Sequence, residues 1–124
     1  MFLSRKGGLS YVARADVATW DFDTTSLTQD GAWHTLNLSA IVPAGAKAVV
    51  LRLGASHSSA GRYFRVAQLG YTQSASGANV ATQVANIINE QTATFAMNTA
   101  RTLSYWAASG TWSSIRVCVL GWWI

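Results

Sequence analysis

Histidine, cysteine and carboxylate side chains carry much of protein catalysis, and this chain has few of them in a recognisable arrangement. Its two histidines are His34, in an apolar stretch, and His57, in a serine-rich segment. The sequence contains no His-x-Glu, Cys-x-x-Cys, His-Glu-x-x-His, Gly-x-Ser-x-Gly or Gly-Lys-Ser/Thr pattern. A Ser/His/Asp triad around His57 would need distant partners, and triads are recognised by geometry, not by residue supply. We therefore expect no enzyme activity, no catalytic residue, no cofactor and no zinc site.

Asp21 and Asp23 are the one carboxylate pair with suggestive spacing. They lie two residues apart, so on a strand both side chains would occupy the same face. Such a pair could contribute to a calcium site or act as the two carboxylates of a glycosidase. Calcium takes about six to eight oxygen ligands, however. We favour a solvent-facing pair opposite Trp20 and Phe22, and we expect no bound metal.

Cys118 is the only cysteine, so the chain cannot form an internal disulfide. It lies in an apolar run, where a free cysteine behaves as a small hydrophobic residue. A buried, unreactive thiol is therefore favoured over a nucleophile. The lack of disulfides is consistent with folding in a reducing cytoplasm.

Six tryptophans are the most informative residues of the chain. Strict alternation in the predicted strand 111–120 assigns Ile115, Val117 and Val119 to the core and Trp112 and Arg116 to the opposite face. Outward tryptophan beside arginine suits a protein interface or stacking against sugar rings, while core packing is the alternative for any single tryptophan. The predicted interface residues are Arg5, Lys6, Trp106, Trp112, Arg116, Trp122, Trp123 and Ile124.

Both ends of the chain are unusual. Residues 1–15 predict an arm, with a flexible Gly7-Gly8 pair and basic anchors. The segment ending in Trp122, Trp123 and Ile124 is strongly apolar, whereas chain ends are normally polar and frayed. These apolar residues either complete the core or dock on a neighbouring subunit, so the sequence predicts a building block attached at both ends.

The composition also favours assembly. Only 11% of the residues are charged, compared with about 25% in a typical soluble domain. Charge keeps free surfaces apart, so a chain with so little of it is expected to cover surface against partners. A Ser/Thr-rich surface that stays soluble without charge is the alternative.

The charge pattern and hydropathy argue against two classes of partner. The net charge of +4 arises from dispersed basic residues, whereas nucleic-acid-binding domains concentrate theirs on one face. No apolar stretch reaches the roughly 18 residues that span a bilayer. The first residues also lack the charge order of a secretory leader. We expect a soluble chain with neither a nucleic-acid nor a membrane partner.

Short β-branched and aromatic segments separated by turn residues predict an all-β fold. The expected strands cover residues 17–23, 32–39, 46–55, 62–69, 79–88, 92–97, 101–107 and 111–120, although residues 79–88 also fit a helical pattern. Roughly eight strands favour an antiparallel, jelly-roll-like β-sandwich. The predicted organisation is an extended arm at 1–15 and one sandwich domain at 16–124.

Residues 30–39 and 41–52 carry a resemblance. Trp33-x-x-Leu36-x-Leu38-Ser39, followed by Val-Pro-Ala-Gly-Ala at 42–46 and a hydrophobic strand, is similar to small β-sandwich proteins of tailed bacteriophages. The remainder agrees only in its short strands, Ser/Gly loops and aromatic C-terminal segment. The resemblance implies a virion structural role, as a capsid decoration protein or a tail or fibre component, and carries over no catalytic residue.

The favoured function is therefore a bacteriophage virion structural protein, made in the host cytoplasm and located in the virion. It is expected to form a homo-oligomer, with a trimer as one candidate, and to bind major capsid or tail proteins. The alternative is a tail-fibre or host-recognition module that binds cell-surface glycans through exposed aromatic side chains. A small hydrolase is the least favoured hypothesis.

Overall fold

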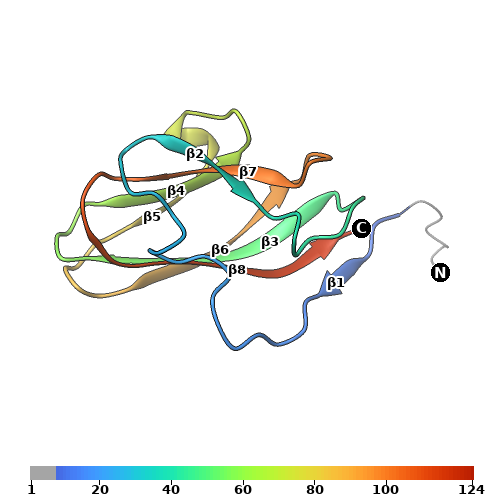
Figure 1. Cartoon of the computed structure of the whole chain (residues 1–124), viewed down its shortest axis with the longest axis horizontal. Coiled ribbons are helices and arrows are strands. Elements are labelled where there is room, and N and C mark those ends of the chain that lie inside the picture. Colours follow the sequence, from blue (N-terminus) through green and yellow to red (C-terminus); the bar gives the residue numbers. More distant parts are fainter. Residues whose placement is uncertain (1–7) are drawn as a thin grey trace.

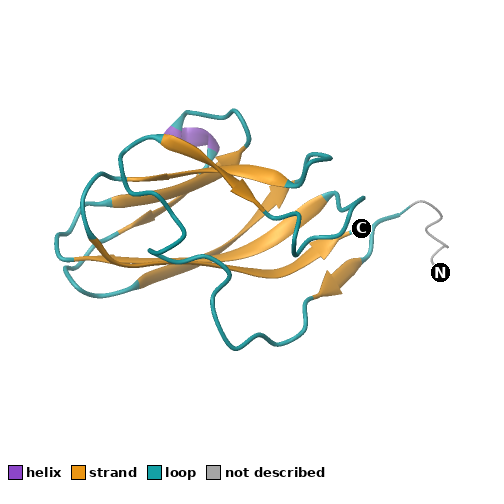
Figure 2. Cartoon of the chain, viewed as in Figure 1, coloured by secondary structure: helices purple, strands orange, loops and turns teal. Residues whose placement is uncertain are grey.

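Two four-stranded antiparallel sheets lie face to face in this structure, a computed structural model that describes residues 8–124 (Figure 1). Sheet A has the strand order β1-β8-β3-β6, and sheet B has the order β2-β7-β4-β5. Sheet A consists of β1 (Tyr11–Ala13), β8 (Trp112–Trp123), β3 (Ala48–His57) and β6 (Asn89–Ala96), and sheet B of β2 (Trp33–Asn37), β7 (Thr102–Ala107), β4 (Tyr63–Gln68) and β5 (Ala78–Ala81). The described part contains one short 3₁₀ helix, η1 (Ser74–Ser76), and no helix there is long and apolar enough to cross a membrane (Figure 2).

The chain pairs as one long hairpin, in which the first four strands pair with the last four in reverse order, and this hairpin is rolled into the two sheets. The pairs β1/β8, β2/β7, β3/β6 and β4/β5 are the successive rungs of that hairpin. The pairs β3/β8 and β4/β7 then join neighbouring rungs within each sheet. This is the eight-stranded jelly-roll arrangement. The predicted all-β, jelly-roll-like sandwich is confirmed.

The core lies between the two sheets and follows the predicted alternation over most of its length. On β3, Val49, Leu51 and Leu53 have no exposed surface, and Ile115 and Val117 on β8 are equally buried. Sheet B supplies the opposing side chains, among them Phe64, Leu36, Leu103 and Val66, each at most 1% exposed. Alternate residues of a strand face opposite sides of the sheet. One face of each strand therefore builds a common apolar layer.

Two β-bulges in β8 change which tryptophans face this layer. The pairing of β8 with β3 shifts by one residue between Val50 and Leu51 and again between Ser56 and His57. A one-residue shift moves every following side chain to the other face. The first bulge turns Trp122 inward and Trp123 outward, and the second turns Trp112 into the core, where it is 4% exposed. The predicted outward orientation of Trp112 is therefore wrong.

One predicted strand is absent, and another is wrong in extent. In 17–23 only Phe22 pairs, as an isolated bridge to Val117. In 79–88 the strand ends at Ala81, a turn with Asn86 at a positive φ of 63° follows, and β6 then begins at Asn89. Within the predicted arm, β1 pairs with the end of β8 (Figure 1), while residues 1–7 lie outside the described part.

Replacing Trp112 and Trp123 separately by alanine tests the orientation set by the bulges. We expect Trp112→Ala to lower the free energy of unfolding by about 3–5 kcal/mol, because it leaves a large cavity in the core. Trp123→Ala should cost less than about 1 kcal/mol, since that ring is already partly in water. Chemical denaturation at low protein concentration, where assembly contributes nothing, measures both. Equal losses would contradict the assigned orientations.

Candidate interaction surfaces

The two histidines lie in different sheets and have different hydrogen-bond partners. The Nε2 of His34 lies 2.8 Å from Oδ1 of Asp30 in a partly exposed pair, and this hydrogen bond holds the pKa of Asp30 below its usual value. His57 is buried, with its ring edge-on to Trp112 at 5.0 Å between centroids. Its Nδ1 accepts a hydrogen bond from the Ser59 N–H at 3.0 Å, and its Nε2 has no hydrogen-bond partner among residues 8–124. No cluster of three or more potential metal-ligating His, Cys, Asp or Glu residues occurs in residues 8–124.

Asp21 belongs to a short segment, residues 14–21, that we call the strap. The strap leaves the edge of β8 at Arg14, whose N–H donates to the Leu120 carbonyl at 3.0 Å, and returns where the Asp21 N–H donates to the Val117 carbonyl at 3.0 Å. Between these points, Oδ2 of Asp21 accepts hydrogen bonds from Arg14 at 2.5 Å and from the Val119 N–H at 2.8 Å. The ion pair thus replaces a paired strand at this part of the edge.

Asp23 has a separate structural role. Its Oδ1 accepts hydrogen bonds from the Thr25 N–H at 2.9 Å and the Thr25 hydroxyl at 2.5 Å. These bonds, the hydroxyl one first, lower the pKa of Asp23. Asp21 and Asp23 therefore bind different partners and do not act as a pair on one strand face.

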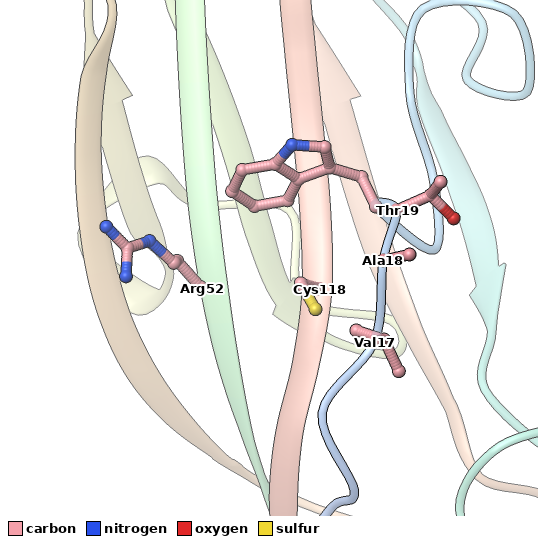
Figure 3. Close-up of a pocket in the computed structure, with 6 residues that line it drawn as sticks. Val17, Ala18, Thr19, Arg52 and Cys118 are labelled. Carbon is pink, nitrogen blue, oxygen red and sulfur yellow. The ribbon is translucent and has the colours of Figure 1, made fainter.

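The strap and sheet A enclose a hollow of about 280 Å³. Val17, Ala18 and Thr19 on the strap lie beside Cys118 on β8, and Arg52 lies on the neighbouring strand β3 (Figure 3). Desolvation is the main cause that raises the pKa of the Cys118 thiol. A neutral thiol is a poor nucleophile. The predicted burial of Cys118 is confirmed, and its predicted lack of reactivity stays a prediction.

The reactivity of Cys118 with a thiol reagent tests how well the strap covers it. At pH 8 we expect the folded protein to react with dithiobis-nitrobenzoate much more slowly than the guanidine-unfolded chain, because the raised pKa leaves little thiolate. Trp20→Ala, which removes a wall of the hollow, should speed the reaction severalfold. Absorbance of the released thiolate measures both rates, and equal rates for folded and unfolded protein would contradict the assignment.

The first and last described segments of the chain pair with each other. Together they carry the largest run of exposed apolar side chains in sheet A. Ser10 and Ile124 exchange backbone hydrogen bonds of 2.9 and 3.0 Å, and the Tyr11 and Trp123 rings lie 5.2 Å apart. The exposed fractions range from 37% for Trp123 to 44% for Leu9. We call this pair of strand ends the terminal ribbon, and its exposed apolar residues are Leu9, Tyr11, Val12, Trp123 and Ile124. By register, Leu9, Tyr11 and Trp123 lie on its outer face, and Val12 and Ile124 lie on the opposite face.

A glycine allows the two strands of the terminal ribbon to approach closely. A Cβ at Gly121 would lie within 2.5 Å of the carbonyl oxygen of Val12 and would also overlap the Tyr11 ring. Only a residue without a side chain permits Tyr11 to cross β8 at this point. The Tyr11 ring therefore lies over Gly121, beside the Trp123 ring.

The predicted interface residues do not form one patch. Trp123 and Ile124 belong to the terminal ribbon, whereas Trp122 is half-buried and packs against the core. Arg116 is half-buried on the outer face of sheet A, with its guanidinium carbon 5.4 Å from the Trp20 ring centroid. Trp106 lies on the outer face of sheet B. Arg5 and Lys6 lie outside the described residues, and their interface role stays a prediction.

Sequence reasoning missed part of each exposed surface. It assigned no role to Leu9, Tyr11 or Val12, although their uncharged, alternating pattern resembles a strand. It also missed the surroundings of Trp106, because these depend on strand register. Trp33, Trp106, Arg65 and Asn79 occupy one line across the four strands of sheet B. We call this line, together with the adjacent Tyr63, the Arg65 row.

No protein-family model and no curated relative matches the chain. Among solved structures, the chain is similar to the coat protein of Tobacco streak virus, with a TM-score of 0.46 and 12% sequence identity. That alignment covers 98% of this chain and 88% of the coat protein.

Proposed function

We propose that this chain is a structural subunit of a bacteriophage virion, a capsid decoration or minor capsid protein that assembles through its terminal ribbon. In this proposal the chain has no catalytic role. Its partners are further copies of itself and the major capsid or tail proteins of the particle. The observation that carries the proposal is the uncovered apolar surface of the terminal ribbon.

The terminal ribbon lacks the features that normally keep a sheet edge from associating. Natural proteins guard edge strands with charged residues, especially lysine, or with proline. The paired segments 10–13 and 121–124 contain no charged side chain and no proline. An apolar, unguarded edge is suited to contact with another protein chain. The low charge of the whole chain, 11%, supports the same interpretation.

The backbone of β1 also offers hydrogen-bonding groups for a further strand. Among the strands of the described residues, β1 lies at the edge of sheet A and pairs only with β8. Ser10 and Arg14 direct their N–H groups toward β8. Antiparallel alternation therefore directs the N–H and C=O groups of Tyr11 and Ala13 away from β8, along the free edge. A strand from another subunit can add there by β-augmentation.

The fold is compatible with this role but does not establish it. Jelly rolls occur in viral capsid proteins, in lectins and in cupins, and one fold hosts many functions. The resemblance of residues 30–52 to tailed-phage β-sandwich proteins favours the virion among these alternatives. It also supports a phage particle as the location.

The double substitution Trp123→Ser with Ile124→Ser tests the apolar contact. We expect the wild-type protein to be oligomeric in solution and this variant to associate at least about tenfold more weakly, because truncating interface anchors typically costs 2 kcal/mol or more. Light scattering after size-exclusion chromatography measures the mass. Trp122 is left intact because it packs against the core.

Val84→Ser with Ile87→Ser is the matched control for that experiment. These side chains are more exposed, at 60% and 59%, and lie in the loop between β5 and β6. Their replacement should leave the oligomer unchanged. A monomeric wild type, or a ribbon variant that assembles normally, would refute the proposal.

The substitution Ala13→Pro tests strand addition separately from apolar contact. Proline removes the Ala13 N–H, which faces the free edge, and proline is tolerated at that side of an edge strand. We expect the midpoint of thermal unfolding to change by only a few degrees while assembly is lost. Circular dichroism and light scattering measure the two effects. Full assembly of this variant would show that β1 does not accept another strand.

A further inference from the structure

A cation and several aromatic rings are aligned on the outer face of sheet B, opposite the core. Register pairs Trp33 with Trp106, Trp106 with Arg65, and Arg65 with Asn79. The row therefore crosses β2, β7, β4 and β5 in that order (Figure 1). Because adjacent strands are about 4.8 Å apart, these side chains are direct neighbours.

Arg65 is held in position from three sides. Its guanidinium carbon lies 4.4 Å from the Trp106 ring centroid and 4.8 Å from that of Tyr63. Its Nε donates to Oδ1 of Asn79 at 2.9 Å. Asn79 is itself fixed, because its Nδ2 donates to the Ser74 carbonyl at 2.8 Å. The plane of the guanidinium group is thus set before any ligand arrives.

The terminal nitrogens of Arg65 remain available. Within residues 8–124, only Nε of this side chain has a hydrogen-bond partner. The three ion pairs of the described residues join Arg14 to Asp21, His34 to Asp30 and Arg52 to Glu90, so no carboxylate among them neutralises Arg65. A planar guanidinium with two free nitrogens matches a carboxylate through two parallel hydrogen bonds.

We propose that the Arg65 row binds a saccharide that carries a carboxylate group, with the carboxylate on Arg65 and the sugar ring against Trp106 or Tyr63. Tryptophan and tyrosine combine an apolar ring face with a polar group, which suits the C–H face of a sugar. The positive charge of Arg65 selects an acidic sugar over a neutral one.

The surroundings of the row favour a small polar ligand over a protein. The neighbouring outward positions in register carry Thr35 on β2, Ser104 on β7, Ala67 on β4 and Ala81 on β5. Among the strand residues of sheet B, Tyr63 is the only large hydrophobic side chain that is well exposed, at 40%. A stable protein interface buries about 800 Å² on each partner around an apolar centre. This face has no such centre, and a single arginine lacks the clustered charge that nucleic acid requires.

This site is independent of the proposed assembly role, because the terminal ribbon lies in sheet A and the Arg65 row in sheet B. Loss of assembly in the ribbon variants should leave saccharide binding unchanged. Failure of either proposal is therefore distinguishable from failure of the other.

A microarray of uronic-acid and sialic-acid oligosaccharides, each beside its methyl ester, tests the proposal on the full chain. We expect one or more acids to bind, with affinity at least about tenfold above that of the ester, because esterification removes the charge that pairs with Arg65. Calorimetric titration of the strongest acid then provides the affinity. Arg65→Gln and Trp106→Ala should each weaken the affinity tenfold or more. The affinity of Arg65→Lys should lie between those of Arg65→Gln and the wild type, because lysine keeps the positive charge but not the planar pair of nitrogens.

Arg62→Gln is the matched control, since it removes one positive charge from an exposed neighbour on the same segment of the chain. It should change the affinity less than twofold. The thermal midpoint and near-ultraviolet circular dichroism of each variant establish that it is folded.

Three results would overturn the proposal. The first is that no acidic saccharide binds to folded wild-type protein. The second is that the methyl esters bind as tightly as the acids, or that Arg65→Gln binds the acid as tightly as the wild-type protein does. The third is that polyglutamate binds more tightly than any saccharide with the same dependence on Arg65, which would assign the row to a protein carboxylate.

Discussion

The pairing of β8 with β3 is the interaction on which most of this structure depends. β8 is the longest strand, with 12 residues, and it contacts β3 on one edge and β1, the strap and Phe22 on the other. The two bulges in that pairing decide that Trp112 lies in the core, that Trp122 packs against it and that Trp123 faces outward. A β8 without bulges would place these rings on the opposite faces. The apolar surface at the terminal ribbon is thus a consequence of backbone register.

The strap provides hydrogen-bond partners for the backbone of β8 beyond the end of β1. Where β1 ends, the edge of β8 would leave backbone groups without a partner, and such groups are costly when buried. Asp21 accepts from the Val119 N–H and Arg14 donates to the Val119 carbonyl. The side chains of Arg14 and Asp21 thereby satisfy both backbone hydrogen-bonding groups of Val119. Arg14 and Asp21 bind each other and the β8 backbone, and the terminal ribbon beside them carries no charged side chain.

The sequence predicted the fold class because that property follows from local pattern. Alternation on β3 and turn residues between short apolar segments were sufficient to predict an eight-stranded sandwich and its main core faces. The bulges, the strap and the Arg65 row were not predicted, because each depends on contacts between distant segments. Trp112 illustrates the difference. Local alternation assigned it to the surface, whereas one inserted residue opposite His57 turns it inward.

The two proposed surfaces belong to different sheets, so one can be covered while the other remains open. A subunit that joins its neighbours through the edge of sheet A would still present the outer face of sheet B. The glycan-binding alternative and the structural role are therefore compatible in one molecule. Each rests on a different set of side chains.

The rolled hairpin also has a consequence for how the chain reaches its native state. Its innermost rung, β4/β5, joins segments close in sequence, whereas the outermost rung joins residues 11–13 to 121–123. Such non-local pairing makes folding slow, because the entropy of closing a long loop is lost before the contacts form. During synthesis, β3 can pair with β6 but has no partner on its other edge until β8 has emerged. The nascent chain passes through a stage in which one side of its central sheet is open, and at that stage it is most exposed to aggregation and most dependent on chaperones.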